Sequence, residues 1–201
     1  MVKIFGDSCC DLTSELRKLH SIDYVKMNVV IDGEEKPASL DWDVFTPSEF
    51  YGYMRKGIRI TTTQVPSAEY VEKFTAALEE GCDIVYISCS GALSGSINTG
   101  IVVAQELMAK YPGREICCVD ALNSCMGQGV QLLKAAELRD AGKTAKEIAD
   151  YITETRLNVN QFATVDTLDG LRRSAHGKAV VQLYVNGQNG VVEHEGLPPL
   201  I

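Results

Sequence analysis

Histidine is scarce in this sequence of 201 residues, which has only three, at His20, His176 and His194. They lie far in sequence from the seven cysteines, and no two cysteines have the C-x-x-C spacing. Zinc sites and thioredoxin-like redox sites depend on such spacings, so we assign no metal ligand. Four of the seven cysteines form adjacent pairs, which rarely bridge to each other. We therefore expect reduced, mostly buried thiols, as in a cytoplasmic protein.

Long apolar runs and basic side chains are also few. No segment approaches the roughly 18 apolar residues of a membrane helix, and residues 1–7 lack the features of a signal peptide. There are 19 lysines and arginines against 27 aspartates and glutamates, a formal net charge of -8. Such a surface repels phosphate backbones, so we expect no nucleic-acid binding. Because no long apolar run is present, we also expect no stable membrane insertion. A small anion could still bind, because nearby backbone dipoles act on it more strongly than distant charges.

Short apolar segments alternate with amphipathic ones along most of the chain. Two capping boxes, Thr46 to Glu49 and Thr144 to Glu147, mark helix starts. This alternation predicts an α/β fold with a parallel sheet flanked by helices on both faces. Ligands of such sheets bind at the carboxyl ends of the strands. The predicted strands are residues 2–5, 24–31, 83–88 and 115–119.

The pattern changes after residue 157. A strand is predicted at residues 161–165, a short helix at 166–173 and a β-hairpin within 180–194. We therefore expect a complete first domain over residues 1–157 and an abbreviated second α/β unit, a partial domain, over residues 158–201.

Hydroxyl-rich loops follow the predicted strands and contain the clearest candidate for a binding site. Ser94, Gly95 and Ser96 lie where a helix begins after the strand at 83–88, so free backbone N–H groups and the helix dipole favour a carboxylate or phosphate. A second polar loop is predicted at residues 61–67. Ordinary helix capping is the alternative explanation for the small polar residues at 94–96. No lysine follows the glycine-rich turn, so it is neither a P-loop nor a dinucleotide fingerprint.

Several residues are candidates for catalysis, each with a structural alternative. Asp7 after the first strand is either an acid or base or a cap for the next helix. Cys9 and Cys10 have no histidine nearby in sequence, which favours structural thiols over nucleophiles. Cys125, at a helix start, is a candidate for a lowered thiol pKa. A small-molecule α/β enzyme acting on a carboxylated or phosphorylated metabolite therefore stays an alternative, although neutral hydroxyls and amides favour binding over catalysis.

Five stretches resemble motifs of the DegV family of bacterial fatty-acid-binding proteins, in that family's order. DSCCDL at 7–12 is similar to its DSxxDL motif, TTQVPS at 62–67 to its TSQ loop, and ISCSGALSGS at 87–96 to its ISxSSxLSGT loop. DALNSCMG at 120–127 resembles its DSxxxSMG turn, and DTLDGLRRS at 166–174 its DTLxxLxxG segment. The resemblance covers roughly residues 1–175. The family's following GGRI turn is replaced here by SAHG at 174–177.

The resemblance implies a lipid carrier without enzymatic activity of its own. A long-chain fatty acid would enter an apolar tunnel and be presented to an ATP-dependent fatty acid kinase subunit, which phosphorylates the carboxylate. The family's carboxylate-binding positions correspond to Thr62 and Ser94, while the Gly95 amide and Ser8 are further lipid-binding candidates. No catalytic residue, metal or cofactor is implied, the fatty acid itself being the ligand.

Overall fold

The computed structural model describes residues 1–161 and two short strands, β8 (Leu183–Val185) and β9 (Val192–His194). The chain divides into two compact units, Met1–Gln161 and Phe162–Ile201. Strands β8 and β9 pair in antiparallel fashion, within the segment predicted as a hairpin. The helix predicted at 166–173 and all but the first residue of the strand predicted at 161–165 lie outside the described residues.

The first unit is built on a parallel four-stranded sheet, which confirms the predicted α/β class. Its strands are rich in aliphatic and aromatic residues that alternate between the two faces, so Ile4 packs into one core cluster and Phe5 into the other. The strands, in the spatial order β2-β1-β6-β7, are β1 (Val2–Asp7), β2 (Ile22–Val25), β6 (Asp83–Ser88) and β7 (Ile116–Asp120).

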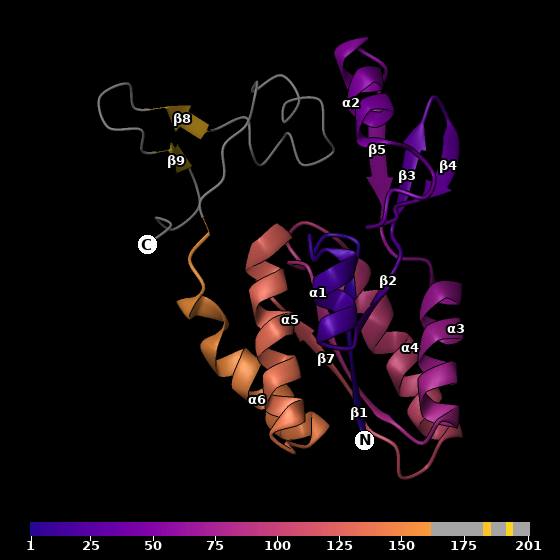
Figure 1. Cartoon of the computed structure of the whole chain (residues 1–201), viewed down its shortest axis with the longest axis vertical. Helices are drawn as coiled ribbons and strands as arrows, with labels where there is room; N and C mark the ends of the chain where they lie inside the picture. Colours follow the sequence, from indigo (N-terminus) through magenta and orange to yellow (C-terminus); the bar gives the residue numbers. More distant parts are fainter. Residues whose placement is uncertain (162–182, 186–191, 195–201) are drawn as a thin grey trace. The chain divides into compact units, whose positions relative to one another are not determined.

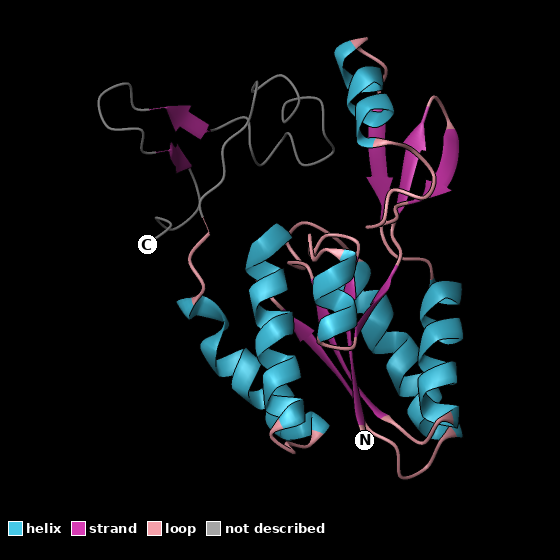
Figure 2. Ribbon diagram, viewed as in Figure 1, coloured by secondary structure: helices cyan, strands magenta, loops and turns pink. Residues whose placement is uncertain are grey.

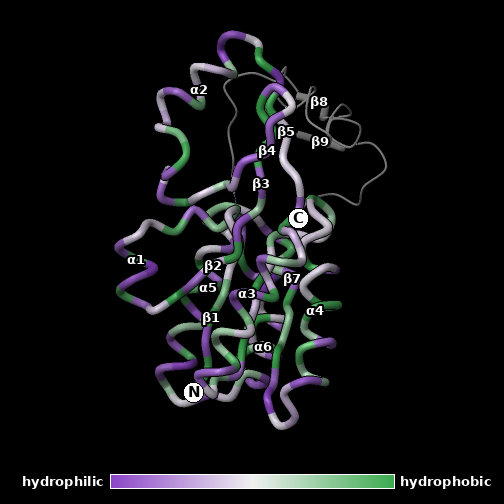
Figure 3. Tube along the Cα trace, turned by 90° about the vertical axis from the view of Figure 1, so that its right-hand side faces the viewer, coloured by the Kyte–Doolittle hydropathy of each residue, from purple (hydrophilic) through white to green (hydrophobic). Residues whose placement is uncertain are grey.

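Helices cover both faces of this sheet (Figures 1 and 2). One core cluster joins the sheet to α1 (Ser14–Leu19), α5 (Cys125–Asp140) and α6 (Ala145–Thr155). The other joins it to α3 (Ser67–Glu79) and α4 (Ser96–Lys110). Hydrophobic and hydrophilic residues alternate along α4 in Figure 3, as expected for a helix with one buried face. The short 3-10 helix η1 (Arg156–Asn158) follows α6.

A small antiparallel sheet lies beyond the carboxyl ends of the parallel strands (Figure 1). Its order is β4-β3-β5, with β3 (Asn28–Ile31), β4 (Glu34–Pro37) and β5 (Ile60–Thr63), and α2 (Pro47–Arg55) connects β4 to β5. The prediction of one strand over 24–31 was therefore wrong, because the chain leaves the parallel sheet after Val25 and enters the small sheet at Asn28. The predicted polar loop at 61–67 was also partly wrong, since its first three residues belong to β5.

Local signals in the sequence located most helix starts. Both predicted capping boxes form: the Thr46 hydroxyl accepts from the Glu49 amide at 3.3 Å and the Thr144 hydroxyl from the Glu147 amide at 3.2 Å. The N-cap of α3 is Pro66, which makes no side-chain hydrogen bond. No helix among the described residues is long and apolar enough to cross a membrane.

Candidate functional site

The order of the strands reverses direction between β1 and β6, which makes this the switch point of the sheet. From β1 the chain adds β2 on one side and later returns to add β6 and β7 on the other. The loops that leave β1 and β6 therefore diverge at their carboxyl ends, where ligands of open α/β sheets bind. The first loop carries Ser8 and Cys9, and the second carries Cys89 and Ser94.

Asp7, the last residue of β1, is fully buried at this switch point. Its carboxylate accepts hydrogen bonds from five groups on three separate segments. The donors are the amides of Cys9 (3.0 Å) and Cys89 (2.9 Å), Nε2 of Gln128 (3.2 Å), and the hydroxyls of Tyr86 and Ser88 (both 3.3 Å). A carboxylate offers about four lone-pair positions, so Asp7 is saturated and joins the ends of β1 and β6 to α5.

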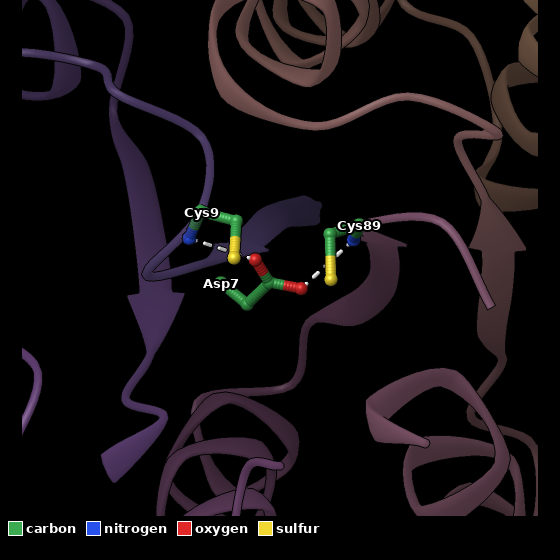
Figure 4. Close-up of side chains that lie close together, drawn as sticks. All are labelled: Asp7, Cys9 and Cys89. Carbon is green, nitrogen blue, oxygen red and sulfur yellow. Dashed lines mark hydrogen bonds between the residues drawn. The ribbon is translucent and has the colours of Figure 1, made fainter. Parts of the chain in front are cut away.

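This saturation leaves Asp7 little capacity for acid–base chemistry or metal binding. Oxygen and sulfur atoms of Asp7, Cys9 and Cys89 lie within 4.8 Å of one another, a spacing that a metal ion could bridge (Figure 4). A metal bound to Asp7 would have to displace several of its donors. Asp7 is not the cap of the next helix either, because Thr13 is the N-cap of α1. We assign Asp7 a structural role.

A chain of hydrogen bonds runs from Asp7 to the start of α4. The Tyr70 hydroxyl donates to the carbonyl of Ser96 at 2.8 Å, and the single proton of the Tyr86 hydroxyl is shared between the Tyr70 oxygen at 2.9 Å and the Asp7 carboxylate at 3.3 Å. Burial raises the pKa of both phenols, so both stay protonated at neutral pH. The saturated carboxylate is thereby connected to the loop that carries Ser94.

Ser96 fixes the direction of the Ser94 hydroxyl. Its Oγ accepts from the amide of Val65 at 3.1 Å and lies 2.8 Å from Oγ of Ser94. Either serine could donate in this contact; because Ser96 is fully buried and Oγ of Ser94 is the acceptor within reach of its hydroxyl, we assign the donated proton to Ser96. Ser94 also accepts from the amide of Ser96 at 3.2 Å, so the hydroxyl proton of this half-buried side chain is left to donate outward.

The four predicted lipid-binding residues have different surroundings. Thr62 is exposed and lies in β5 opposite Val29, on a strand rather than in the expected loop. Ser94 directly precedes α4, as expected, and Gly95 lies so close to Gln64 that an added Cβ would be 2.1 Å from Oε1 of Gln64. Gln64 and Val65, which follow β5, therefore bring the Thr62 segment against the Ser94 loop.

Ser8 is the most constrained of the four. Its hydroxyl donates to the carbonyl of Ala38 at 2.7 Å and accepts from the amide of Met27 at 3.0 Å. These bonds connect the β1 loop to the segments that lead into and out of the small sheet. Ser8 therefore has a structural task in addition to its predicted role toward a lipid.

A largely apolar cavity opens beside Ser8. Its volume is about 600 Å³, within the range of about 300–1,000 Å³ that is usual for small-molecule sites. Neither Thr62 nor Ser94 is among its lining residues. A larger, more polar depression of about 1220 Å³ shares Ser14 and Asp41 with this cavity and extends to the first residues of β1. The apolar side chains that line the smaller cavity include Leu12, Val29, Leu40, Trp42, Phe45 and Phe50.

None of the three cysteines considered for catalysis, Cys9, Cys10 and Cys125, has a lowered pKa. All seven are free thiols, with Cys10, Cys82 and Cys89 buried and Cys125 exposed. Burial raises the pKa of Cys10 to about 11. The pKa of Cys125 is also raised, by partial desolvation and the nearby Asp11 carboxylate, which is opposite to the lowering considered from its place at a helix start.

Sequence reasoning missed the residues that support the candidate site. Tyr70, Tyr86 and Gln128 lie in segments that read simply as buried helix or strand. Their polar atoms contact Asp7 or Ser96 across 26 to 121 residues of sequence. The only signal in the sequence was a polar side chain within an otherwise apolar segment, and such a side chain does not predict which residue it contacts.

The chain is similar to known proteins along most of its length. The model of a family described as uncharacterised proteins of the DegV family matches residues 1–180. A DegV domain-containing protein of Clostridium perfringens is 36% identical over 85% of this chain and 58% of its own length. One from Deinococcus radiodurans is 30% identical over 85% of this chain and 58% of its own length. The chain thus spans less than two thirds of the length of these relatives.

Solved structures show the same fold. A DegV family protein from Thermus thermophilus, described for its fatty acid binding, has a TM-score of 0.77 and 27% identity, over 97% of this chain and 70% of its own. DegV from Bacillus subtilis, described as a fatty acid binding protein, has a TM-score of 0.72 over 90% of this chain and 62% of its own. At 22% identity, the second shows likeness of fold alone.

Proposed function

The chain belongs to the DegV family, and from that premise we propose that it is a cytoplasmic carrier that binds one long-chain fatty acid. The observation that carries the proposal is the Ser94 hydroxyl, which the buried Ser96 orients outward as a donor at the start of α4. Thr62 and the Gly95 amide would complete the carboxylate site, with Ser8 at its margin. The fatty acid binding described for the Thermus thermophilus relative supports the choice of ligand.

Burial of the acyl chain would supply most of the affinity. Each buried methylene is worth about 0.8 kcal/mol, so roughly 14 of them supply on the order of 10 kcal/mol before entropic costs. Hydrogen bonds from neutral hydroxyls to a carboxylate add about 1.5–3 kcal/mol each and set its orientation. The apolar cavity beside Ser8 supports a site for the chain at this edge of the sheet.

The direct test is to identify what co-purifies with the protein. The full chain is purified without detergent, denatured and extracted, and its lipids are quantified by mass spectrometry. We expect close to one equivalent of long-chain fatty acid. Folded protein that carries no fatty acid, and takes up none when oleate is added, would contradict the proposal.

We further propose that the bound fatty acid is a substrate for a separate ATP-dependent fatty acid kinase. The chain has no lysine after its glycine-rich turn with which to hold nucleotide phosphates, which supports a carrier rather than an enzyme. Lipid-loaded protein mixed with magnesium and ATP is expected to form no acyl phosphate, measured as the hydroxamate after trapping with hydroxylamine. Acyl phosphate formation by the purified chain alone would contradict this division of labour.

Ser96 provides a prediction specific to the carboxylate site. Ser96→Ala removes the group that orients the Ser94 hydroxyl and the acceptor of the Val65 amide. We expect fatty acid affinity to fall about 10-fold and the free energy of unfolding to fall by about 1–3 kcal/mol. Ser96→Thr, which keeps the hydroxyl and matches the family motif, should retain both properties. Affinity is measured by competition with a fluorescent fatty acid, and equal losses in both variants would contradict the orienting role.

A further inference from the structure

Two cysteine thiols lie close together at the carboxyl ends of β1 and β6. Sγ of Cys9 and Sγ of Cys89 lie within 4.8 Å of each other and of an Asp7 oxygen (Figure 4). The amides of both cysteines donate to that carboxylate, at 3.0 and 2.9 Å. The saturated Asp7 carboxylate therefore fixes the positions of Cys9 and Cys89 relative to each other, although they are 80 positions apart in sequence.

We propose that Cys9 and Cys89 are a modification site, a dithiol that low-molecular-weight disulfides such as glutathione disulfide convert to an intramolecular disulfide. The Cys9 thiolate attacks the reagent, forming a mixed disulfide and releasing one glutathione thiolate, which takes up the proton lost by Cys9. Cys89, deprotonated in turn, attacks the Cys9 sulfur and releases the second glutathione. The two protein thiols lose two electrons in total, and the reagent gains them.

The two residues follow neighbouring strands of the parallel sheet. β1 ends at Asp7 and β6 at Ser88, and the two strands pair in parallel. The Sγ atoms of Cys9 and Cys89 lie within 4.8 Å of each other and must approach to about 2.05 Å for a disulfide to form.

Burial sets the order of events. Cys9 is half-buried and Cys89 is fully buried, so a reagent in solution reaches Cys9 first and Cys89 acts as the resolving thiol. Contact with the Cys89 side chain, burial and the Asp7 carboxylate raise the pKa of Cys9. Its thiolate is scarce at neutral pH, so the reaction rate is expected to rise about tenfold per pH unit between pH 7 and 9.

The neighbouring cysteines are not equivalent partners. Cys10 belongs to the core cluster on one face of the sheet, whereas Cys9 packs against the cluster on the other face. A metal ion held by both thiolates and Asp7 would have to displace donors that already fill the acceptor positions of this carboxylate. A disulfide is neutral and leaves the five hydrogen bonds of Asp7 intact.

The test treats the reduced full chain with glutathione disulfide at pH 8, denatures it in acid, alkylates the free thiols and maps its peptides by tandem mass spectrometry. We expect one Cys9–Cys89 cross-link, which leaves the other five of the seven cysteines to be alkylated. Cys10→Ser and Cys82→Ser should leave the cross-link in place, and Cys9→Ser and Cys89→Ser should abolish it. The loop of about 80 residues should raise the melting temperature by on the order of 10 °C.

Three results would overturn the proposal. They are alkylation of all seven cysteines, a persistent glutathione adduct on Cys9, and a cross-link that involves Cys10 or Cys82 instead. Peptide mapping of the unmodified sequence decides among them even if a serine variant does not fold. The reaction needs no fatty acid, so its failure and the failure of the proposed carrier function are separate results.

Discussion

Asp7→Asn is expected to lower the free energy of unfolding by about 3 kcal/mol or more. One amide oxygen replaces two carboxylate oxygens, and the new NH2 group then faces either the two donors at Oδ1 or the three at Oδ2. At least two buried donors lose their acceptor, each at a cost of about 1–3 kcal/mol. For a domain of this size the melting temperature should fall by on the order of 10 °C, measured by calorimetry or circular dichroism.

The exposed Asp32 provides a matched control for this substitution. It lies in the turn between β3 and β4 with a φ of 52°, a conformation that asparagine also adopts readily. Asp32→Asn should change the free energy of unfolding by no more than about 0.5 kcal/mol. If Asp7→Asn is equally mild, Asp7 is not the structural anchor described above, and its ionised state would have to serve a function instead.

The double variant Thr62→Ala, Ser94→Ala is expected to lose at least 100-fold in affinity for a long-chain fatty acid. Each hydroxyl would contribute one hydrogen bond to the ligand carboxylate, worth about 1.5–3 kcal/mol, and 1.4 kcal/mol corresponds to a tenfold change. Purified double variant should therefore retain little lipid by mass spectrometry. Single variants should each lose about 10-fold or more.

Stability measurements separate loss of the ligand site from loss of the fold. Thr62 is exposed, so its replacement should leave the melting temperature unchanged, whereas Ser94→Ala removes the hydrogen bonds to Ser96 and should cost about 1 kcal/mol. Thr61→Ala, at the neighbouring position on the opposite face of β5, should retain the lipid and serves as the control. Full lipid occupancy in the double variant would rule out this carboxylate site.

Patterns of short range were sufficient for much of the fold. The alternation of apolar strands with amphipathic helices predicted the parallel α/β class, and the capping boxes at Thr46 and Thr144 located two helix starts. The helix start after Ser94 was also expected. Each of these features depends on residues within a few positions of one another, where backbone preferences and side-chain capping act directly.

The errors arose where two local patterns ran together. Residues 24–31 form one apolar stretch in sequence, yet Val25 ends a strand of the parallel sheet and Asn28 begins a strand of the small sheet. Threonine-rich residues 61–63 suit a polar loop or an edge strand equally well, and pairing with β3 decides for the strand. Strand partners are distant in sequence, so local propensity cannot choose between these outcomes.

By itself, the sequence determined the fold class, the hydroxyl-rich character of the strand-end loops and the resemblance to the DegV family. Only the tertiary structure decided that Asp7 is a saturated anchor, that Ser96 orients Ser94, and that Cys9 meets Cys89. The physical reason is separation along the chain: Asp7 meets Cys89 across 82 residues and Gln128 across 121. Such contacts exist only after strand order has brought the ends of β1 and β6 together, because hydrogen bonds and thiol contacts act over a few ångströms.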